Sequence, residues 1–169
     1  MPDTPQKGFR IGVLSDTHGL LRPRVLELLA GCDRLLHAGD VGSEQILERL
    51  RRIAPVEAVR GNVDTEPPLS ALPEVLSGHL GARAGDGDAS EDSLPFRMTH
   101  RREDVKRSWA KEARLVVFGH SHRPELEWKG RCLYLNPGAC GRRRFHLPLT
   151  LAILHMREGR LVPELLAVE

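Results

Sequence analysis

Seven side chains in this sequence are of types that bind divalent metal ions, and they fall in five short segments that each follow an apolar run. Hard and borderline divalent ions prefer carboxylate, amide and imidazole ligands. A single Asp-x-His arises often by chance, but five such segments predict one shared site. The candidate metal ligands are Asp16, His18, Asp40, Asn62, His100, His120 and His122.

Such a ligand set favours hydrolysis of phosphate esters. Two ions bridged by one carboxylate lie roughly 3.5–4 Å apart and lower the pKa of a shared water from about 15.7 towards neutrality. The resulting hydroxide can attack phosphorus while the ions neutralise charge on the phosphoryl oxygens. Asp40 offers two carboxylate oxygens, one for each ion. Gly39, Gly61 and Gly119 beside the ligands would let the backbone approach the ions closely.

Structural roles are the alternative for each candidate taken alone. A lone His100 or Asn62 is more often structural than a ligand, Asp16 could cap a helix, and Asp64 could form an Asx-turn. All these alternatives would have to hold together at five segments, so we favour the shared site. The remaining histidines lie outside the pattern and are predicted to be structural or on the surface: His37, His79, His146 and His155.

The first sixty residues have the pattern of alternating strands and helices. Apolar runs predict strands at 9–14, 34–37 and 56–59, and helical spacing predicts helices at 23–30 and 43–53. This β-α-β-α-β order is typical of a parallel sheet. Sites on such sheets form beyond the carboxyl ends of the strands, where Asp16, Asp40 and Asn62 fall.

The second half is expected to be rich in strands and mostly antiparallel. We predict strands at 96–99 and 115–118, a helix at 102–111, and two hairpins, at 126–135 and 149–168. The stretch 81–93 is small, polar and acidic and predicts a mobile loop, and residues 1–8 are expected to be disordered. We expect one domain over residues 1–169.

Composition argues against several protein classes. The 169 residues carry a net charge of +2, with 40% hydrophobic and 28% charged residues, which is ordinary for a soluble globular protein. No signal peptide and no membrane span is evident, and three scattered cysteines without a Cys-x-x-Cys favour a reduced, cytoplasmic compartment. The densest basic cluster, Arg142-Arg143-Arg144, is interpreted as a solvated loop, with phosphate binding as the alternative.

The order and spacing of these motifs resemble those of the calcineurin-like metallophosphoesterases, over nearly the whole chain. Two further segments, Asn62-Val63-Asp64 and Asn136-Pro137-Gly138-Ala139, are similar to the small prokaryotic phosphodiesterase subgroup. The segments that carry the family resemblance are Asp16-x-His18, Gly39-Asp40, Gly61-Asn62, His100 and Gly119-His120-x-His122.

This resemblance implies an α/β fold, a four-layer α/β/β/α sandwich of two mixed sheets flanked by helices. It also implies that Asp40 bridges two metal ions and acts in catalysis, with Asn62 and His100, through metal-bound hydroxide. Mn²⁺ is the expected ion, with Fe, Zn²⁺, Ni²⁺ or Co²⁺ as alternatives. The implied ligands are Asp16, His18 and His122 for one ion, and Asn62, His100 and His120 for the other.

Two positions depart from the family pattern. Many members carry a histidine after the motif asparagine, which protonates the leaving group, but this chain has Val63. Without that acid, substrates with good leaving groups are favoured. Arg101 stands where the family usually has glycine, which puts the pose of His100 in question.

We therefore predict a phosphodiesterase that acts on a small phosphoester. The alternative is a non-catalytic, metal-binding scaffold module of the same fold, which the presence of all seven ligands disfavours. A nuclease is ranked low, since aromatic residues make up only 4% of the chain and strand-binding grooves use them. Neither nucleic acid nor a membrane is an expected partner, and the sequence leaves the oligomeric state open.

Overall fold

The computed structural model describes residues 8–81 and 93–169. The expected disordered start at 1–8 and the expected mobile loop at 81–93 lie almost wholly outside the described residues.

One of two five-stranded sheets, here sheet A, has the strand order β10-β9-β1-β2-β3. Its first three strands in the sequence, β1 to β3, are parallel, as predicted, whereas β9 pairs with β1 and β10 in antiparallel fashion. The strands are β1 (Phe9–Leu14), β2 (Arg34–His37), β3 (Val56–Ala58), β9 (Thr150–Arg157) and β10 (Arg160–Ala167).

The second sheet, sheet B, has the order β4-β5-β6-β8-β7. Its central strands β5, β6 and β8 are parallel, and only the edge strands β4 and β7 are antiparallel. The pairings of the strands in the second half are thus mostly antiparallel, as predicted, but the parallel centre of sheet B was not predicted. The strands are β4 (Val75–Leu80), β5 (Leu94–Thr99), β6 (Leu115–Val117), β7 (Glu125–Lys129) and β8 (Cys132–Asn136).

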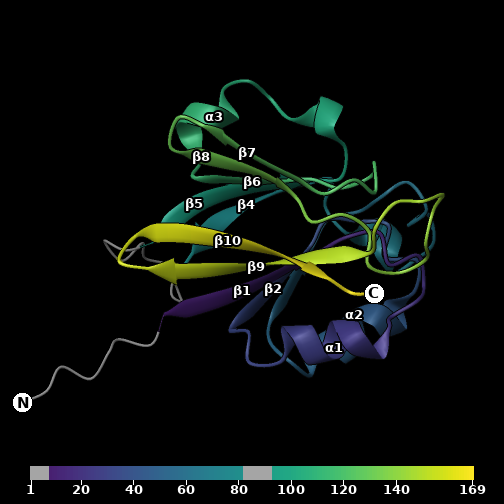
Figure 1. Ribbon diagram of the computed structural model, residues 1–169. Helices are drawn as coiled ribbons and strands as arrows, with labels where there is room; N and C mark the ends of the chain where they lie inside the picture. Colours follow the sequence, from purple (N-terminus) through teal and green to yellow (C-terminus); the bar gives the residue numbers. More distant parts are fainter. Residues whose placement is uncertain (1–7, 82–92) are drawn as a thin grey trace, which may run out of the picture.

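Three apolar clusters hold four layers together (Figure 1). Helices α1 (Pro23–Leu29) and α2 (Glu44–Arg51) cover the outer face of sheet A, and the short α3 (Trp109–Glu112) covers sheet B. Alternate residues of each strand point to opposite faces. In β1, Ile11 and Val13 pack between the sheets, whereas Leu14 packs under the helices.

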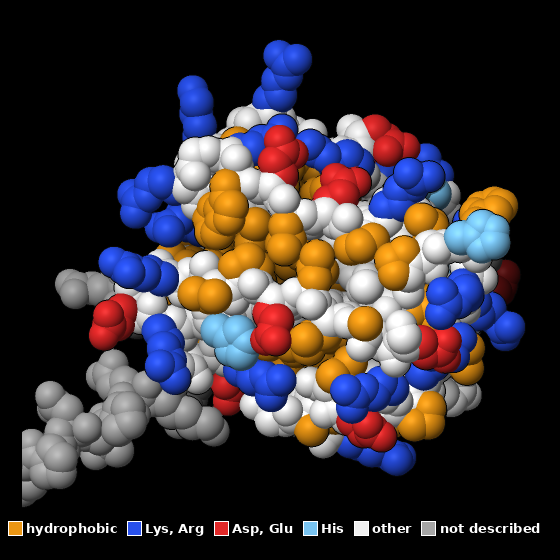
Figure 2. All heavy atoms as spheres, in the orientation of Figure 1, with side chains coloured by type: hydrophobic (Ala, Val, Ile, Leu, Met, Phe, Trp, Pro, Cys, Tyr) orange, Lys and Arg blue, Asp and Glu red, His pale blue; other side chains and the backbone are white. Residues whose placement is uncertain are grey.

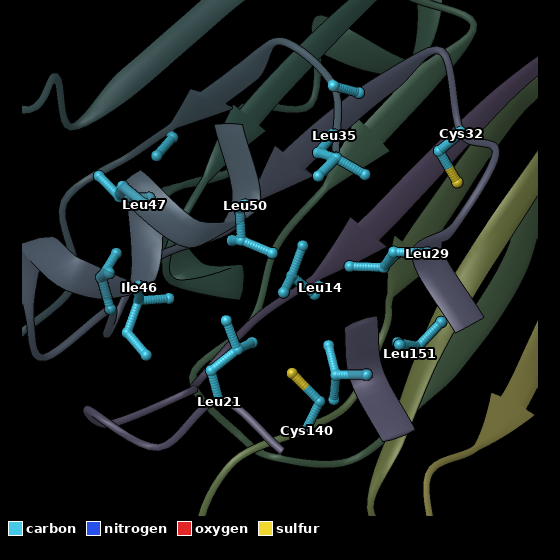
Figure 3. Packing of buried hydrophobic residues seen from close by; sticks show 14 of the residues in the cluster. Leu14, Leu21, Leu29, Cys32, Leu35, Ile46, Leu47, Leu50, Cys140 and Leu151 are labelled. Carbon is cyan, nitrogen blue, oxygen red and sulfur yellow. The ribbon is translucent and has the colours of Figure 1, made fainter. Parts of the chain in front are cut away.

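The cluster beneath α1 and α2 is the larger of the two outer apolar clusters. Leu29 of α1 and Leu50 of α2 surround Leu14 (Figure 3). Gly12 permits this approach, because a Cβ there would lie 2.4 Å from the Leu29 side chain. The amphipathic pattern of α2, with Ile46, Leu47 and Leu50 buried, explains its firm docking.

In the middle of the chain one prediction was wrong and one strand was missed. The helix expected at 102–111 is instead a 3-10 turn at Arg102–Asp104 and the separate helix α3. Strand β4 was not predicted, because its residues alternate between exposed and half-buried at a sheet edge and carry a glycine. The ends of the predicted hairpins match β7–β8 and β9–β10 within one or two residues.

The surface seen in Figure 2 carries mixed charges around a band of hydrophobic side chains. Strand β7 at the edge of sheet B contributes two exposed hydrophobic residues, Leu126 and Trp128. None of the helices within residues 8–81 and 93–169 has the length and apolar content needed to cross a bilayer.

Candidate metal centre

The candidate ligands follow the carboxyl ends of the parallel strands of both sheets. Asp16, Asp40 and His100 come after β1, β2 and β5, and His120 after β6. Their ligand atoms gather into two groups, and within each group they lie within 4.8 Å of one another. The first group is Asp16, His18 and His122, and the second group is Asp40, His100 and His120.

The ligand-bearing loops adopt backbone torsions that non-glycine residues rarely use. Of the seven described non-glycine residues with positive φ, five are candidate ligands. Such torsions cost energy, of order 1–3 kcal/mol each, and persist only where the surroundings enforce them. The resulting tight turns direct side chains that are two residues apart in the sequence towards the same point. The five residues and their φ angles are Asp16 (56°), His18 (45°), Asp40 (54°), His120 (71°) and His122 (61°).

The first group is buried and closely spaced. His122 Nε2 lies 3.3 Å from Asp16 Oδ1 and 3.3 Å from His18 Nε2. Asp16 Oδ2 is fixed by the Ser15 hydroxyl at 2.7 Å and by the His120 amide at 3.1 Å. Asp16 Oδ1 is buried and has no hydrogen-bond partner among the described residues. Burial raises the pKa of Asp16, but the neighbouring His122 and His18 imidazoles and the Ser15 hydroxyl outweigh it and hold that pKa below its usual range.

The second group brings an imidazole nitrogen against a carboxylate. His100 Nδ1 lies 2.7 Å from the carbonyl oxygen of Ala38, so Nδ1 carries the proton and Nε2 of the neutral ring is a bare lone pair. That Nε2 is buried without a hydrogen bond and lies 3.2 Å from Asp40 Oδ2. Two lone pairs so placed repel unless a proton or a metal ion lies between them. Burial lowers the pKa of His100, but Asp40 outweighs it and raises that pKa above its ordinary value.

Asp40 lies where the two groups meet. Its Oδ1 accepts a hydrogen bond from the Val63 amide at 3.0 Å. Its Oδ2 lies 3.5 Å from His18 Nε2 and 3.2 Å from His100 Nε2, and so faces both groups. Burial raises the pKa of Asp40, but the contacts with His100 and Val63 prevail and lower it.

Asn62 is placed differently from the other candidates. Its side chain is exposed, and its Oδ1 accepts a hydrogen bond of 3.4 Å from Arg101 Nε. Arg101 itself has φ −102° and ψ 139°, an extended conformation open to any residue. The backbone after His100 therefore does not require a glycine. The arginine at position 101 imposes no backbone strain that would change the orientation of His100.

His37, which we predicted to be structural, joins two ligand loops. It is fully buried, and its Nδ1 accepts a hydrogen bond from the Gly39 amide at 3.2 Å. Its Nε2 therefore donates to the Thr17 hydroxyl at 3.0 Å, and that hydroxyl donates to the Val41 carbonyl at 2.8 Å. Burial lowers the pKa of His37 to about 4, so the ring stays neutral.

Asp64 is a second support that sequence reasoning did not assign. Its buried carboxylate accepts backbone hydrogen bonds from Val41 at 3.1 Å, Gly42 at 2.9 Å and Gly61 at 2.9 Å. It thus joins the Asp40 loop to the Asn62 loop. The Asx-turn considered for Asp64 is not formed by these bonds, because an Asx-turn bonds an amide two residues further along the chain and the local donor, Gly61, precedes Asp64. The sequence carries no signal for the two bonds to Val41 and Gly42.

The glycines beside the ligands serve close approach. A Cβ at Gly61 would lie 2.1 Å from the Asp40 nitrogen, and one at Gly119 would lie 2.1 Å from Ser15 Oγ. Neither position tolerates a side chain without displacing a ligand loop.

With this geometry in view, the chain can be compared with known proteins. Residues 9–159 match the calcineurin-like phosphoesterase superfamily domain. The chain belongs to this family. A probable metallophosphoesterase from Methanothermobacter thermautotrophicus is 32% identical over 138 residues, which are 76% of this chain and 76% of that protein.

Similar solved structures confirm the four-layer fold that the resemblance implied. A structure described as that of a novel archaeal phosphodiesterase matches with a TM-score of 0.73 and 23% identity, over 94% of this chain and 100% of that one. Vacuolar Protein Sorting 29 from Cryptosporidium parvum matches with a TM-score of 0.67 and 20% identity, over 94% and 97% of the two chains. At these identities the two matches establish the fold alone.

The metallophosphoesterase family is metal-dependent, and the residues of this chain fit that requirement. Asp16 Oδ1 and His100 Nε2 are buried without hydrogen bonds among the described residues, and each belongs to a group of potential ligands. Buried polar atoms are normally satisfied, so such atoms call for an explanation. A cation at each group would satisfy both.

Two pockets flank this site, one beside each group. A pocket of about 640 Å³ lies beside the second group. It is lined by His100, Asn62 and Arg101, together with Arg60 and Glu74. A pocket of about 490 Å³ lies beside His18 and His122. Both volumes are in the range of small-molecule sites.

Proposed function

We propose that this protein is a phosphodiesterase that binds two divalent metal ions at the two ligand groups. The observation that carries the proposal is the bare Nε2 of His100 against Asp40 Oδ2, matched by the unsatisfied Oδ1 of Asp16 in the first group. The family membership supports phosphoester chemistry, and the archaeal phosphodiesterase of the same fold supports a diester substrate.

Each residue has a distinct task in this proposal. Asp16, His18 and His122 would hold one ion, and His100, His120 and Asn62 the other. Asp40, whose Oδ2 faces both groups and whose Oδ1 accepts from the Val63 amide, would be shared by the two ions. Such a pair of ions supplies an activated water and neutralises charge on the phosphoryl group.

The leaving group would depart without a protein acid at position 63. Val63 is 46% exposed and lines the pocket beside the first group, where it offers no proton. Asp64 does not replace the missing histidine, because its carboxylate is committed to three backbone amides. We therefore expect diesters with acidic phenol leaving groups to react faster than alkyl diesters.

Val63→His tests this leaving-group prediction. The new histidine should raise the rate on alkyl diesters and narrow the gap to aryl diesters, by about 10²-fold at most, the lower end of general acid catalysis. Equal rates on both classes in the unchanged protein, with chemistry rate-limiting, would mean that another acid is present.

Mn²⁺ is the ion we propose, on ligand chemistry. Carboxylate, amide and imidazole ligands suit Mn²⁺, Fe and Zn²⁺, and Ni²⁺ or Co²⁺ can substitute. The three cysteines are all buried in the structure, and neither ligand group includes one.

The direct test is metal analysis of protein purified without chelator, followed by assays on phosphomonoesters, phosphodiesters and cyclic nucleotides. We expect two ions per chain and hydrolysis of diesters that is lost on chelation and restored by Mn²⁺. Tight binding of two ions without turnover of any phosphoester would instead support the alternative function, a metal-binding scaffold. The likeness to Vacuolar Protein Sorting 29 and the exposed Leu126 and Trp128 are the observations that favour this second candidate.

A further inference from the structure

The arginine cluster at 142–144 is held against the first ligand group by backbone contacts. The Cys140 amide donates to the Ser15 carbonyl at 3.3 Å, so this chain segment runs beside the Asp16 loop. Gly141 packs so closely there that a Cβ would lie 2.0 Å from the Thr17 carbonyl oxygen. Arg142 Nε then donates to the His18 carbonyl at 3.3 Å. The position of the cluster relative to the ligands is therefore set by the fold.

The three arginines differ in how their charges are used. Arg143 is tied down, since its guanidinium lies 3.1 Å from the Glu169 carboxylate and donates to the Leu147 carbonyl at 3.3 Å. Arg142 uses only Nε, for the His18 carbonyl, and carries no ion pair with a described residue. Arg144 is exposed and has neither an ion pair nor a side-chain hydrogen bond within residues 8–81 and 93–169. Two guanidinium groups are thus available to an anion.

These arginines line the pocket beside the first group, and the pocket's character differs from that of its neighbour. It contains no acidic residue among its described lining residues, which are His18, Gly42, Val63, His122, Arg142, Arg143 and Arg144. The pocket beside the second group is mixed, with Glu74 and Asp104 facing Arg60 and Arg101. A diester has two substituents, and a scissile phosphate between the ligand groups would direct one substituent into each pocket.

We propose that the pocket of Arg142 and Arg144 binds a second phosphoryl group of the substrate, so that the preferred substrate is a small phosphodiester carrying a further phosphate on one substituent. This inference rests on the proposed function, since it places the scissile phosphate at the ligand groups. Guanidinium groups bind phosphate oxygens through paired, charge-assisted hydrogen bonds, and the absence of a competing carboxylate in the pocket preserves their charge for that purpose.

A matched pair of substrates isolates this second phosphate. The two substrates are thymidine 5′-(4-nitrophenyl phosphate) and its 3′-phosphorylated form. Both have the same scissile bond and the same leaving group. We expect kcat/KM to be about tenfold higher for the 3′-phosphorylated form, the effect of one hydrogen-bonded charge pair. Arg144→Gln should remove most of that preference. Arg160→Gln, with the same charge change at the exposed start of β10 and at the opposite end of sheet A, should retain it.

Calorimetric binding of thymidine 3′,5′-bisphosphate and of thymidine 5′-monophosphate gives a readout that does not need turnover. We expect tighter binding of the bisphosphate, with the difference reduced in Arg144→Gln and kept in Arg160→Gln. If neither substrate is hydrolysed but this binding pattern holds, the proposed function fails and the phosphate site stands. Equal binding and equal turnover of the two forms, or a preference that Arg144→Gln leaves intact, would overturn the inference.

Discussion

The two ligand groups are completed to different degrees. The first group draws all its members from buried or half-buried positions, and its carboxylate is fixed by the Ser15 hydroxyl and the His120 amide. The second group is equally tight around His100, but its expected fourth ligand, Asn62, is exposed and hydrogen-bonded to Arg101. In the proposed site the first group would therefore need no rearrangement to hold an ion, whereas Asn62 would have to leave Arg101 before it could join the second group.

The identity of a potential ligand and its freedom to bind an ion are therefore separate properties. Residue types and spacing decide which side chains can reach an ion. The freedom to bind depends on neighbours such as Arg101, which compete for the same oxygen. We therefore expect the first group to bind its ion more tightly, and the following changes test that comparison.

Asp40→Asn should have the largest effect, because Asp40 Oδ2 faces both groups. The amide has lost the charge that attracts the ions, so we expect loss of at least one bound ion. Turnover should fall by more than the roughly 10–100-fold typical of residues that only support ligands. Metal content and diester hydrolysis are the measurements. The control is Glu158→Gln, in the exposed turn between β9 and β10. A near-normal rate with two bound ions in Asp40→Asn would refute the bridging role.

Acidification tests His37, which holds the loops of both groups together. Its folded pKa is lowered to about 4 by burial, against 6.5 ordinarily, so the unfolded chain takes up this proton first. Stability is therefore complete above pH 6.5 and falls as the pH drops towards 4. The lowered carboxyl pKa values of Asp16 and Asp40 act below this window, and the raised pKa of His100 stabilises the fold at low pH, with the opposite sign.

Chemical denaturation of the chelated protein at pH 7 and pH 5 measures this effect. The free energy of unfolding should be about 2 kcal/mol lower at pH 5, on the order of one bound proton over the interval. In His37→Gln that loss of stability at pH 5 should largely disappear, and the opposite contribution of His100 should remain. An unchanged dependence in the variant would show that other groups cause it.

Arg101→Ala tests whether Arg101 withholds Asn62 from the second group, and it should have the smallest effect. Freeing Asn62 Oδ1 should raise the affinity of the second ion by up to about tenfold, the value of one hydrogen bond, while the first ion is unaffected. Titration with Mn²⁺ measures both affinities. Arg107→Ala is the control, because that side chain is exposed and makes no hydrogen bond or ion pair with a described residue. A weaker second ion in Arg101→Ala would mean that Arg101 supports the site.

Strong local patterns made much of the fold predictable from the sequence. Buried strands such as β1 and β2 are continuous apolar runs, and α2 has a clear apolar face, so their ranges match within two residues. Edge strand β4 lacks such a run, and the 102–111 segment has helical composition but is divided by a bend. Local propensity is weak evidence where tertiary packing decides.

The residues of the site could be predicted from the sequence, but the backbone conformation of its loops could not. The spacing of His120 and His122 after an apolar run marked them as candidates, yet nothing in the sequence predicts their positive φ angles of 71° and 61°. The same holds for Arg101, whose contact with Asn62 joins loops 39 residues apart. Such contacts depend on the assembled sheets, which sequence spacing does not encode.

We expect two ions to bind side by side, with the first group filling before the second. Anomalous diffraction from crystals equilibrated with low and high Mn²⁺ tests it most directly. At low Mn²⁺ we expect one peak among Asp16, His18 and His122, and at high Mn²⁺ a second peak at the second group, with Asp40 Oδ2 contacting both. A single site at every concentration, or a first peak at the second group, would contradict the account.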